Sequence, residues 1–372
     1  MRQTILVLLL AKIIAIGSLY YLFLHTVVDR GFRHYLHVPD GSSRTEALQA
    51  AQDRFPMRLT CIDGQFYLKI AEEGYTFTSG NDFVFFPLFP VFVSLLATLF
   101  GNPALCGFAL NLVASLLGLL ILSRVIVRAL GSSPLPTLLL LLAFPTAGFY
   151  NFFYTEGLFL LLSSATLYMA LNRRFALAAL LGFLCGLVRP QGVLLVLPIF
   201  AEAWKSMRLP EAQRGRLHLS LRLLSSLAPL AGMAAFACYV GSHTGSIFSI
   251  FDAQSAWNRS IGPHAVTQLL SQESSRFRTD ILAAVFGVAL LPLLFRKLPF
   301  SLALFGFGMV AMPLATGSFL SFARFIATSS PHFMALSIAL EKRPAFWAAG
   351  FTVMLFLQVF FNRALMSWVF CA

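Results

Sequence analysis

The sequence predicts an all-α polytopic membrane protein, and three observations support this. Of its 372 residues, 58 % are hydrophobic and only 11 % are charged, whereas roughly 25 % of residues are charged in an average soluble domain. Apolar runs long enough to cross a bilayer recur along the chain. Short basic clusters separate these runs. So few charges cannot cover a soluble surface, which excludes a soluble enzyme, a nucleic-acid-binding protein and a disordered chain.

The predicted spans begin with a retained N-terminal anchor and continue to the end of the chain. They cover Ile5–Val27, Ala104–Arg128, Leu135–Tyr150, Thr155–Leu171, Leu219–Gly241, Ile281–Phe295, Phe300–Phe319, Phe325–Leu340 and Ala345–Phe361. Two further segments are ambiguous. Phe83–Phe100 carries two prolines near its start, and Phe175–Trp204 is either one tilted helix or two short helices broken at Arg189-Pro190.

Charge distribution resolves both ambiguities, because Lys and Arg gather in short cytoplasmic loops. If Phe83–Phe100 lies at the interface and Phe175–Trp204 crosses twice, all the basic clusters fall on one side. These clusters are Arg2, Arg124 with Arg128, Arg173 with Arg174, Lys205 to Arg216, Arg296 with Lys297, and Lys342 with Arg343. That side holds 15 basic and 3 acidic residues, and the other side holds 12 of each. This arrangement predicts about 11 transmembrane helices with the N-terminus inside.

The chain has no internal repeat or flexible linker, so residues 1–372 are predicted to form one membrane domain. Residues 28–103 form the first outer loop, with interfacial helices, and residues 242–279 form the second. The 5 cysteines are scattered without metal-ligand spacing, so we expect neither a metal site nor a disulfide framework.

Polar residues beside the apolar runs converge on the outer face, where ionisable groups are functional candidates because they are costly at membrane depth. Asp63 is either a helix cap or a general base that takes a proton from an acceptor hydroxyl. Arg189 and Arg324 either extend to lipid headgroups or hold a phosphate, since guanidinium groups bind phosphate with paired donors. A lipid-linked phosphate fits, because its tail can stay in the bilayer.

Other polar and aromatic residues on this face have two interpretations each. Glu156 either stabilises its helix, because a carboxylate at a helix N-terminus interacts favourably with the helix dipole, or orients a ligand hydroxyl or an arginine. His332 is either a satisfied interior histidine or a proton carrier. Tyr67, Tyr154 and Trp257 are either interface anchors and core residues or a wall that stacks on a sugar ring.

The segments that carry these residues resemble the GPI mannosyltransferase 2 (PIG-V type) family. Asp63-Gly-Gln-Phe-Tyr67, followed by Phe85-Phe-Pro-Leu-Phe-Pro90, resembles the first lumenal loop of that family. Tyr154-Thr-Glu156 is similar to its Tyr-Ser/Thr-Glu element, and Arg189-Pro-Gln191-Gly192 to its Ala-x-x-Arg-x-x-Gly element. Gln254 with Trp257 is similar to Gln-x-x-Trp, and Ser321-Phe-Ala-Arg324 to Ser-x-x-Arg-Tyr. One departure is Cys61-Ile62, where the family has Trp before its Asp.

More broadly, the chain resembles the GT-C superfamily of membrane glycosyltransferases. The resemblance implies transfer of a sugar, typically mannose, from a polyprenyl-phosphate donor to a lipid or glycan acceptor, with the acid of the first loop as base and no cofactor or essential metal. The short chain suggests a bacterial relative, in the inner (cytoplasmic) membrane, with its active site facing the periplasm. We have no expectation for a partner subunit.

Taken together, the sequence predicts an inverting transferase in which Asp63 is the general base and Arg189 and Arg324 bind the donor phosphate. Sugar or acceptor contacts are assigned to Tyr67, Tyr154, Glu156, Gln191, Gln254, Trp257 and His332. Two other functions stay open. A lipid-phosphate or lipid-linked-sugar transporter or flippase would need polar residues that continue to the cytoplasmic face. A structural membrane subunit would tolerate Asp63→Asn together with Arg324→Ala.

Overall fold

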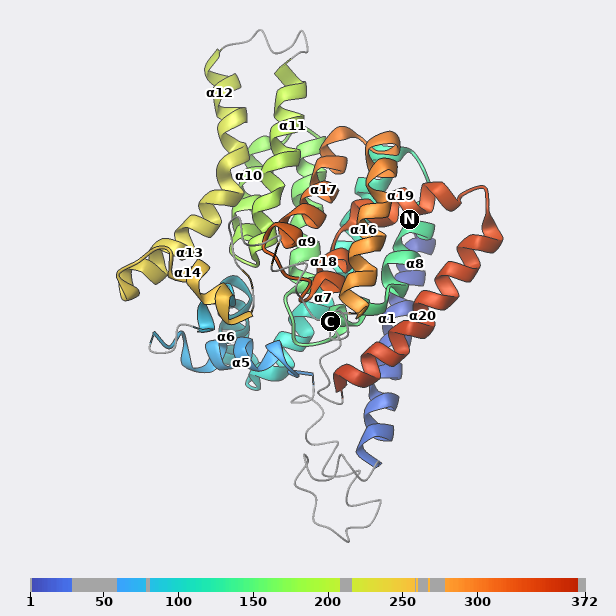
Figure 1. Cartoon of the computed structure of the whole chain (residues 1–372), viewed down its shortest axis with the longest axis horizontal. Helices are drawn as coiled ribbons and strands as arrows, with labels where there is room; N and C mark the ends of the chain where they lie inside the picture. The colour runs from blue at the N-terminus through green and yellow to red at the C-terminus, as the bar shows by residue number, and fades with distance from the viewer. Residues whose placement is uncertain are drawn as a thin grey trace.

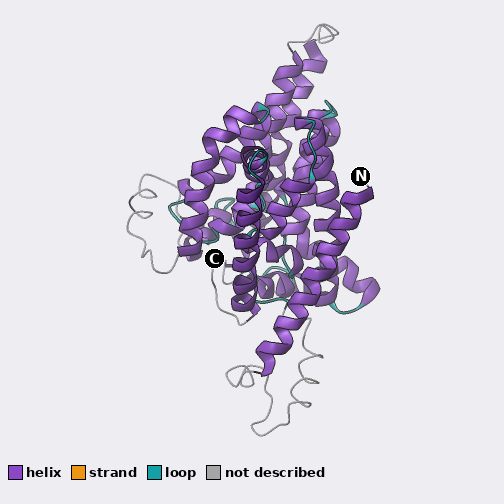
Figure 2. Cartoon of the chain, turned by 90° about the vertical axis from the view of Figure 1, so that its right-hand side faces the viewer, coloured by secondary structure: helices purple, strands orange, loops and turns teal. Residues whose placement is uncertain are grey.

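The computed structural model describes residues 2–28, 59–77, 81–207, 216–257, 259, 267 and 278–366. Within these ranges every regular element is a helix (Figure 1; Figure 2). Residues 29–58 of the first outer loop and most of residues 258–277 in the second lie outside the described residues, as does the basic segment 208–215. The prediction of an all-helical membrane protein is confirmed.

The elements follow one another as a series of helices of unequal length. The first part of the chain contains α1 (Arg2–Val28), α5 (Asp63–Glu73), η1 (Asn81–Val84), α6 (Leu88–Phe100), α7 (Pro103–Leu130), α8 (Leu135–Ala143), η2 (Pro145–Asn151), α9 (Glu156–Leu171), α10 (Phe175–Gly186) and η3 (Pro190–Leu195). The second contains α11 (Val196–Met207), α12 (Arg216–Leu224), η5 (Ser225–Leu227), α13 (Ala228–Thr244), α14 (Ser249–Asp252), η6 (Ala253–Trp257), α16 (Arg278–Lys297), α17 (Phe300–Ala315), α18 (Phe322–Ala327), α19 (Ser330–Leu340) and α20 (Pro344–Met366).

Five helical segments in the described chain are long and apolar enough to cross a bilayer. They are Gln3–Leu22 in α1, α7, Ser220–Thr244 across α12 and α13, α16, and α20. A sixth is formed if η2 and α9, which meet at 95°, count as one bent span. The larger number of about 11 spans, which includes the short helices, stays a prediction.

Prolines break several of the apolar runs, because the residue before a proline is pushed out of the helical conformation. Arg189 is extended before Pro190, with φ −158° and ψ 153°, and Phe175–Trp204 is therefore two helices, α10 and α11, as predicted. The same rule overturns the continuous helix expected over Leu135–Tyr150. Phe144, with ψ 139°, ends α8 before Pro145. The run Phe325–Leu340 is also divided, between α18 and α19, and there Pro331 lies in the first turn of α19.

The first outer loop contains the short helices that the sequence predicts there. α5 buries Tyr67, Leu68, Ile70 and Ala71 and leaves Glu72 and Glu73 exposed, so it is amphipathic. α6 has 13 residues, which makes it about 20 Å long, whereas a bilayer core is about 30 Å thick. α6 is too short to cross by itself, and this agrees with an interfacial position. α5 and α6 pack side by side at the lower left of Figure 1.

The longer helices pack in a bundle whose two ends differ in charge. α7 packs along α9, α10 packs against α9 and α13, and α16 packs against α17, α18 and α19. Arg128 at the end of α7 donates to Asn172, which follows α9, at 3.3 Å. Arg222 of α12 similarly donates to Ser206 of α11 at 3.5 Å. The Arg222 guanidinium also lies 6.0 Å from the ring centroid of Phe175, which directly follows Arg173 and Arg174. The predicted basic clusters of these helices therefore share one end of the bundle.

Candidate active site

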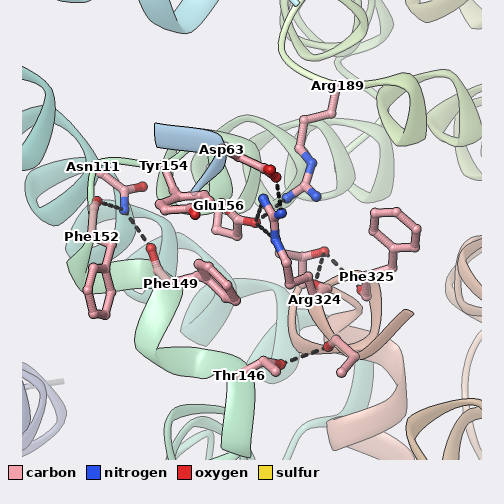
Figure 3. A network of polar contacts seen from close by, with 12 residues as sticks. Asp63, Asn111, Thr146, Phe149, Phe152, Tyr154, Glu156, Arg189, Arg324 and Phe325 are labelled. Atoms are coloured by element: carbon pink, nitrogen blue, oxygen red, sulfur yellow. Dashed lines mark hydrogen bonds and ion pairs between the residues drawn. The ribbon is translucent and has the colours of Figure 1, made fainter. Parts of the chain in front are cut away.

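Four charged side chains meet at the other end of the bundle in an alternating cluster (Figure 3). Arg324 of α18 donates through Nη1 to Asp63 Oδ2 at the start of α5. Its Nε and Nη2 lie 2.9 Å and 2.8 Å from Glu156 Oε1, at the start of α9. Arg189, just before η3, places Nη1 2.9 Å from the same oxygen. Two carboxylates thus neutralise two guanidinium groups.

Burial differs among these four groups in a way that separates their roles. The side chains of Glu156 and Arg324 are 1 % and 4 % exposed, whereas that of Asp63 is 17 % exposed. Buried charges need partners, and both arginines share Glu156. The Arg324 guanidinium also lies over the rings of Phe149 and Tyr154, 4.6 Å and 4.8 Å from their centroids. Asp63 is therefore the more accessible of the two carboxylates.

Contacts from η2 and its surroundings fix the position of Asp63. Phe153 N donates to Leu59 O at 2.9 Å, and Tyr154 Oη donates to Cys61 O at 2.7 Å. Ile62 has φ +55°, which is an unusual backbone conformation for a β-branched residue. Such strained backbone conformations cluster at functional sites. Ile62 occupies the N-cap position of α5, so Asp63 is not the cap.

Asn111 on α7 fixes the bend that carries Glu156. Its Nδ2 donates to Phe149 O and Phe152 O, both at 2.8 Å, and its Oδ1 accepts from Gly157 N at 2.6 Å. A Cβ at Gly157 would lie 2.2 Å from Asn111 O, so only glycine allows this approach. Sequence reasoning missed Asn111, although an amide inside an apolar span is a recognisable signal.

Asp280, in the first turn of α16, fixes the turn that carries Arg324. Its two carboxylate oxygens accept from Ser321 N at 3.0 Å and from Ala323 N at 2.8 Å. Ser321 has φ +64°, which places it in the left-handed region. Thr146 of η2 donates to Ala323 O at 2.8 Å. Asp280 was also missed, because it stands at the boundary between a span and a loop.

A small pocket of about 50 Å³ opens beside the charge cluster. It is lined by Asp63, Tyr67, Val84, Phe85, Val188, Arg189, Pro190, Gln191, Gln254, Trp257, Arg259, Ser321, Arg324 and Phe325. Seven of the ten predicted site residues are in this wall. The other three do not line it. Tyr154 and Glu156 lie behind the wall and contact Arg324, and His332 is buried with Nδ1 2.7 Å from Ser329 Oγ.

Aromatic rings form one side of the pocket. The ring of Phe85 lies 4.8 Å from that of Phe66, 5.0 Å from Tyr67 and 5.7 Å from Trp257 between centroids. Burial raises the pKa of Tyr67 to about 12, so its hydroxyl remains a hydrogen-bond donor at neutral pH. Phe85 was recognised in its motif but not among the site residues. Gln191 Oε1 is buried without a hydrogen-bond partner among the described residues.

A second, larger cavity of about 620 Å³ adjoins the pocket. Pro190, Gln191, Gln254, Arg259 and Phe325 line both spaces. The rest of its wall is mainly apolar and includes Phe86, Val193, Leu194, Met233, Ile250, Phe251, Met312 and Pro313. Within the described chain, no three His, Cys, Asp or Glu side chains come together in a way that could hold a metal ion.

The comparison that decides the family covers the first part of this site. The model of the family described as Mannosyltransferase (PIG-V) matches residues 5–207, more than half of the chain. The chain belongs to the PIG-V mannosyltransferase family. The matched region contains Asp63, Glu156, Arg189 and Gln191, whereas Arg324 lies beyond it. No curated protein and no solved structure matches the chain. Membership in the PIG-V family, together with the apolar helices, makes the protein a multi-pass membrane mannosyltransferase.

Proposed function

We propose that this protein transfers mannose from a polyprenyl-phosphate donor to a lipid or glycan acceptor in the pocket beside Asp63. The observation that carries the proposal is the meeting of Asp63, Arg189 and Arg324 at one pocket in a PIG-V family member. Asp63 and Arg324 are 261 residues apart in sequence. A base and two cations at one opening fit a reaction in which a hydroxyl loses a proton and a phosphate leaves.

The reaction is a single displacement. The acceptor oxygen forms a bond to the anomeric carbon of mannose, and its proton passes to Asp63. The bond between that carbon and the phosphate oxygen breaks, and its electron pair stays on the polyprenyl phosphate. Attack from the face opposite the leaving group inverts the anomeric configuration. The route uses the side chains of this chain and requires no cofactor.

The alternating charges couple proton transfer to departure of the phosphate. Proton uptake neutralises Asp63, and Arg324 then loses one of its two anionic partners. At the same moment the leaving phosphate gains negative charge. Arg324 and Arg189 both line the pocket and stabilise this charge as it develops, which is the condition for lowering the barrier. Glu156 stays paired with both arginines and keeps them in place.

The remaining predicted residues are assigned by their position relative to the pocket. Gln191 offers a buried acceptor oxygen that no described residue satisfies, and a sugar hydroxyl would satisfy it. Tyr67 offers a donor, and Trp257 offers an aromatic face for the sugar ring. Gln254 holds Arg259 through a hydrogen bond of 3.1 Å. Tyr154 and Glu156 act through Arg324, and no substrate contact is proposed for His332.

The proposed location is the inner membrane of a bacterium, with the pocket facing the periplasm. The basic clusters at the opposite end of the bundle support this orientation, because such clusters remain in the cytoplasm. The acceptor is a lipid or glycan with a free hydroxyl that can reach the outer face.

Incubation of the purified protein with radiolabelled polyprenyl-phosphate-mannose and a crude lipid acceptor tests the proposal. Wild type should release polyprenyl phosphate and form a mannosylated product. Asp63→Asn should keep the fold and lower turnover by about a hundredfold or more, the scale of general-base catalysis. Glu73→Gln, on the exposed face of the same helix, is the matched control and should be active. Full activity of Asp63→Asn removes the base assignment. If the protein reconstituted in vesicles moves the lipid between leaflets and forms no mannosylated product, the transporter function is favoured.

A further inference from the structure

Arg259 lies at the boundary between the polar pocket and the apolar cavity and lines both. Its Nη1 donates to Gln254 Oε1 and its Nη2 to Leu320 O, each at 3.1 Å. The guanidinium stands over the ring of Phe325, 5.4 Å from the centroid. These contacts hold the guanidinium plane in one orientation. All three partners are uncharged.

Carboxylates pair with two of the three arginines that line the pocket. Asp63 and Glu156 offset Arg324 and Arg189. Among the described residues, Arg259 has no carboxylate within ion-pair distance, although Asp63 and Asp280 act on it from farther away. Burial lowers the pKa of Arg259 to about 10, so it is still charged at neutral pH. The positive charge of Arg259 therefore has no ion-pair partner among the described residues, and a partly buried cation favours an anionic ligand.

The apolar cavity indicates what kind of anion fits. Its volume of about 620 Å³ is within the range of roughly 300–1,000 Å³ for small-molecule sites. Apart from Arg259, the charged side chain in its wall is that of Asp252, which is exposed. A ligand that fills both spaces has an apolar chain in the larger cavity and an anionic group at Arg259. A prenyl phosphate has these two parts.

We propose that Arg259 binds the phosphate of the prenyl-phosphate ligand before reaction, with the first isoprene units in the apolar cavity and the attached sugar directed toward Asp63. This rests on the proposed function and refines it. A phosphodiester carries one negative charge, which matches the unpaired positive charge of Arg259. Arg259 holds the donor in its ground state, whereas Arg189 and Arg324, already paired with carboxylates, act as the leaving phosphate gains charge.

Binding measurements on the purified full chain test this assignment without turnover. The probes are farnesyl phosphate, farnesol and inorganic phosphate, each titrated by calorimetry. Arg259→Gln should weaken farnesyl phosphate binding about 10- to 100-fold, the scale of charge-assisted hydrogen bonds, and leave farnesol binding unchanged. The affinity of Arg259→Lys for farnesyl phosphate should lie between those of wild type and Arg259→Gln, because lysine keeps the charge but lacks the planar guanidinium. Arg128→Gln, at the other end of the bundle, is the matched control and should bind as wild type does.

A second variant tests the cavity. Met233→Trp fills space in its wall and should weaken farnesol and farnesyl phosphate binding to the same extent. Inorganic phosphate should bind more weakly than farnesyl phosphate to wild type. The assignment is wrong if Arg259→Gln binds farnesyl phosphate as wild type does, or if it loses farnesol binding equally. It is also wrong if Met233→Trp changes the affinity for neither farnesol nor farnesyl phosphate, or if inorganic phosphate binds to wild type as tightly as farnesyl phosphate does.

The outcome separates this inference from the proposed function. If wild type transfers mannose and Arg259→Gln changes neither the donor KM nor farnesyl phosphate binding, the transferase proposal stands and the phosphate assignment fails. If Arg259→Gln weakens farnesyl phosphate binding selectively but wild type transfers no sugar, the phosphate site stands and the transferase proposal fails.

Discussion

Glu156 contacts both buried arginines through one oxygen, and no described residue provides a hydrogen-bond partner for its other oxygen. Glu156→Gln would leave Arg189 without its carboxylate and Arg324 with Asp63 alone. We expect the free energy of unfolding to fall by about 3–5 kcal/mol, the usual cost of breaking a buried ion pair. Thermal unfolding in detergent measures this, with Glu73→Gln as control.

A double variant separates loss of the pair from loss of packing. In Glu156→Gln/Arg189→Gln the unpaired charge is gone, so the melting temperature should recover part of the loss seen in Glu156→Gln. If Glu156→Gln unfolds at the wild-type temperature, the cluster does not stabilise the fold.

The sequence identified 7 of the 14 residues that line the pocket, but not how the charged ones pair. Asp63, Arg189 and Arg324 were predicted to share one face, and the structure brings them to one pocket. The sequence could not show that Glu156 lies between the arginines, because sidedness assigns a residue to a leaflet and not to a neighbour. Arg259, two residues after the Gln254–Trp257 element, was not among the predicted site residues and stood out only when the other charges were paired.

At the scale of elements, the turn before α18 depends on Asp280. Asp280→Ala removes acceptors from two backbone amides, Ser321 N and Ala323 N, and should lower the free energy of unfolding by about 1–3 kcal/mol. As a positioning residue for Arg324, Asp280 should also affect kcat more than the donor KM. Asp280→Asn keeps one acceptor oxygen and should restore part of kcat. Wild-type kcat in Asp280→Ala would contradict this role.

The contact between α7 and α9 depends on a glycine. In Gly157→Ala the new Cβ would lie 2.2 Å from Asn111 O, so the helices must separate, at a cost of about 1–3 kcal/mol. Gly350→Ala is the matched control, because no atom lies within 4 Å of its added Cβ and alanine favours a helix. Melting temperatures should fall for the first variant only. Equal temperatures for both would show that the α7–α9 contact tolerates a side chain.

The helix breaks were predictable only in part. The break at Arg189-Pro190 was predicted from its proline and from the sidedness of the basic clusters, whereas Phe144-Pro145 lies within a continuous apolar run and was passed over. The same backbone rule acts at both places. Hydropathy therefore located the apolar segments correctly but overestimated the continuity of the helices within them.

At the scale of the molecule, charge sidedness predicted which helix ends share a face. Impermeant thiol labelling in intact cells tests the orientation, in a background with Cys238, the exposed cysteine of the described chain, replaced by serine. Glu73→Cys on α5 should react without permeabilisation, and Lys342→Cys after α19 only once the cells are permeabilised. The reverse pattern would place the pocket in the cytoplasm.

The central claim is that a prenyl-phosphate sugar donor binds in the pocket between Asp63 and Arg259. The most direct measurement is a cryo-electron microscopy map of Asp63→Asn with polyprenyl-phosphate-mannose bound. The account predicts phosphate density at the Arg259 guanidinium, the sugar between residue 63 and Gln191, and the prenyl chain in the apolar cavity. Donor density at the basic end of the bundle, or an empty pocket beside donor bound elsewhere, would contradict it.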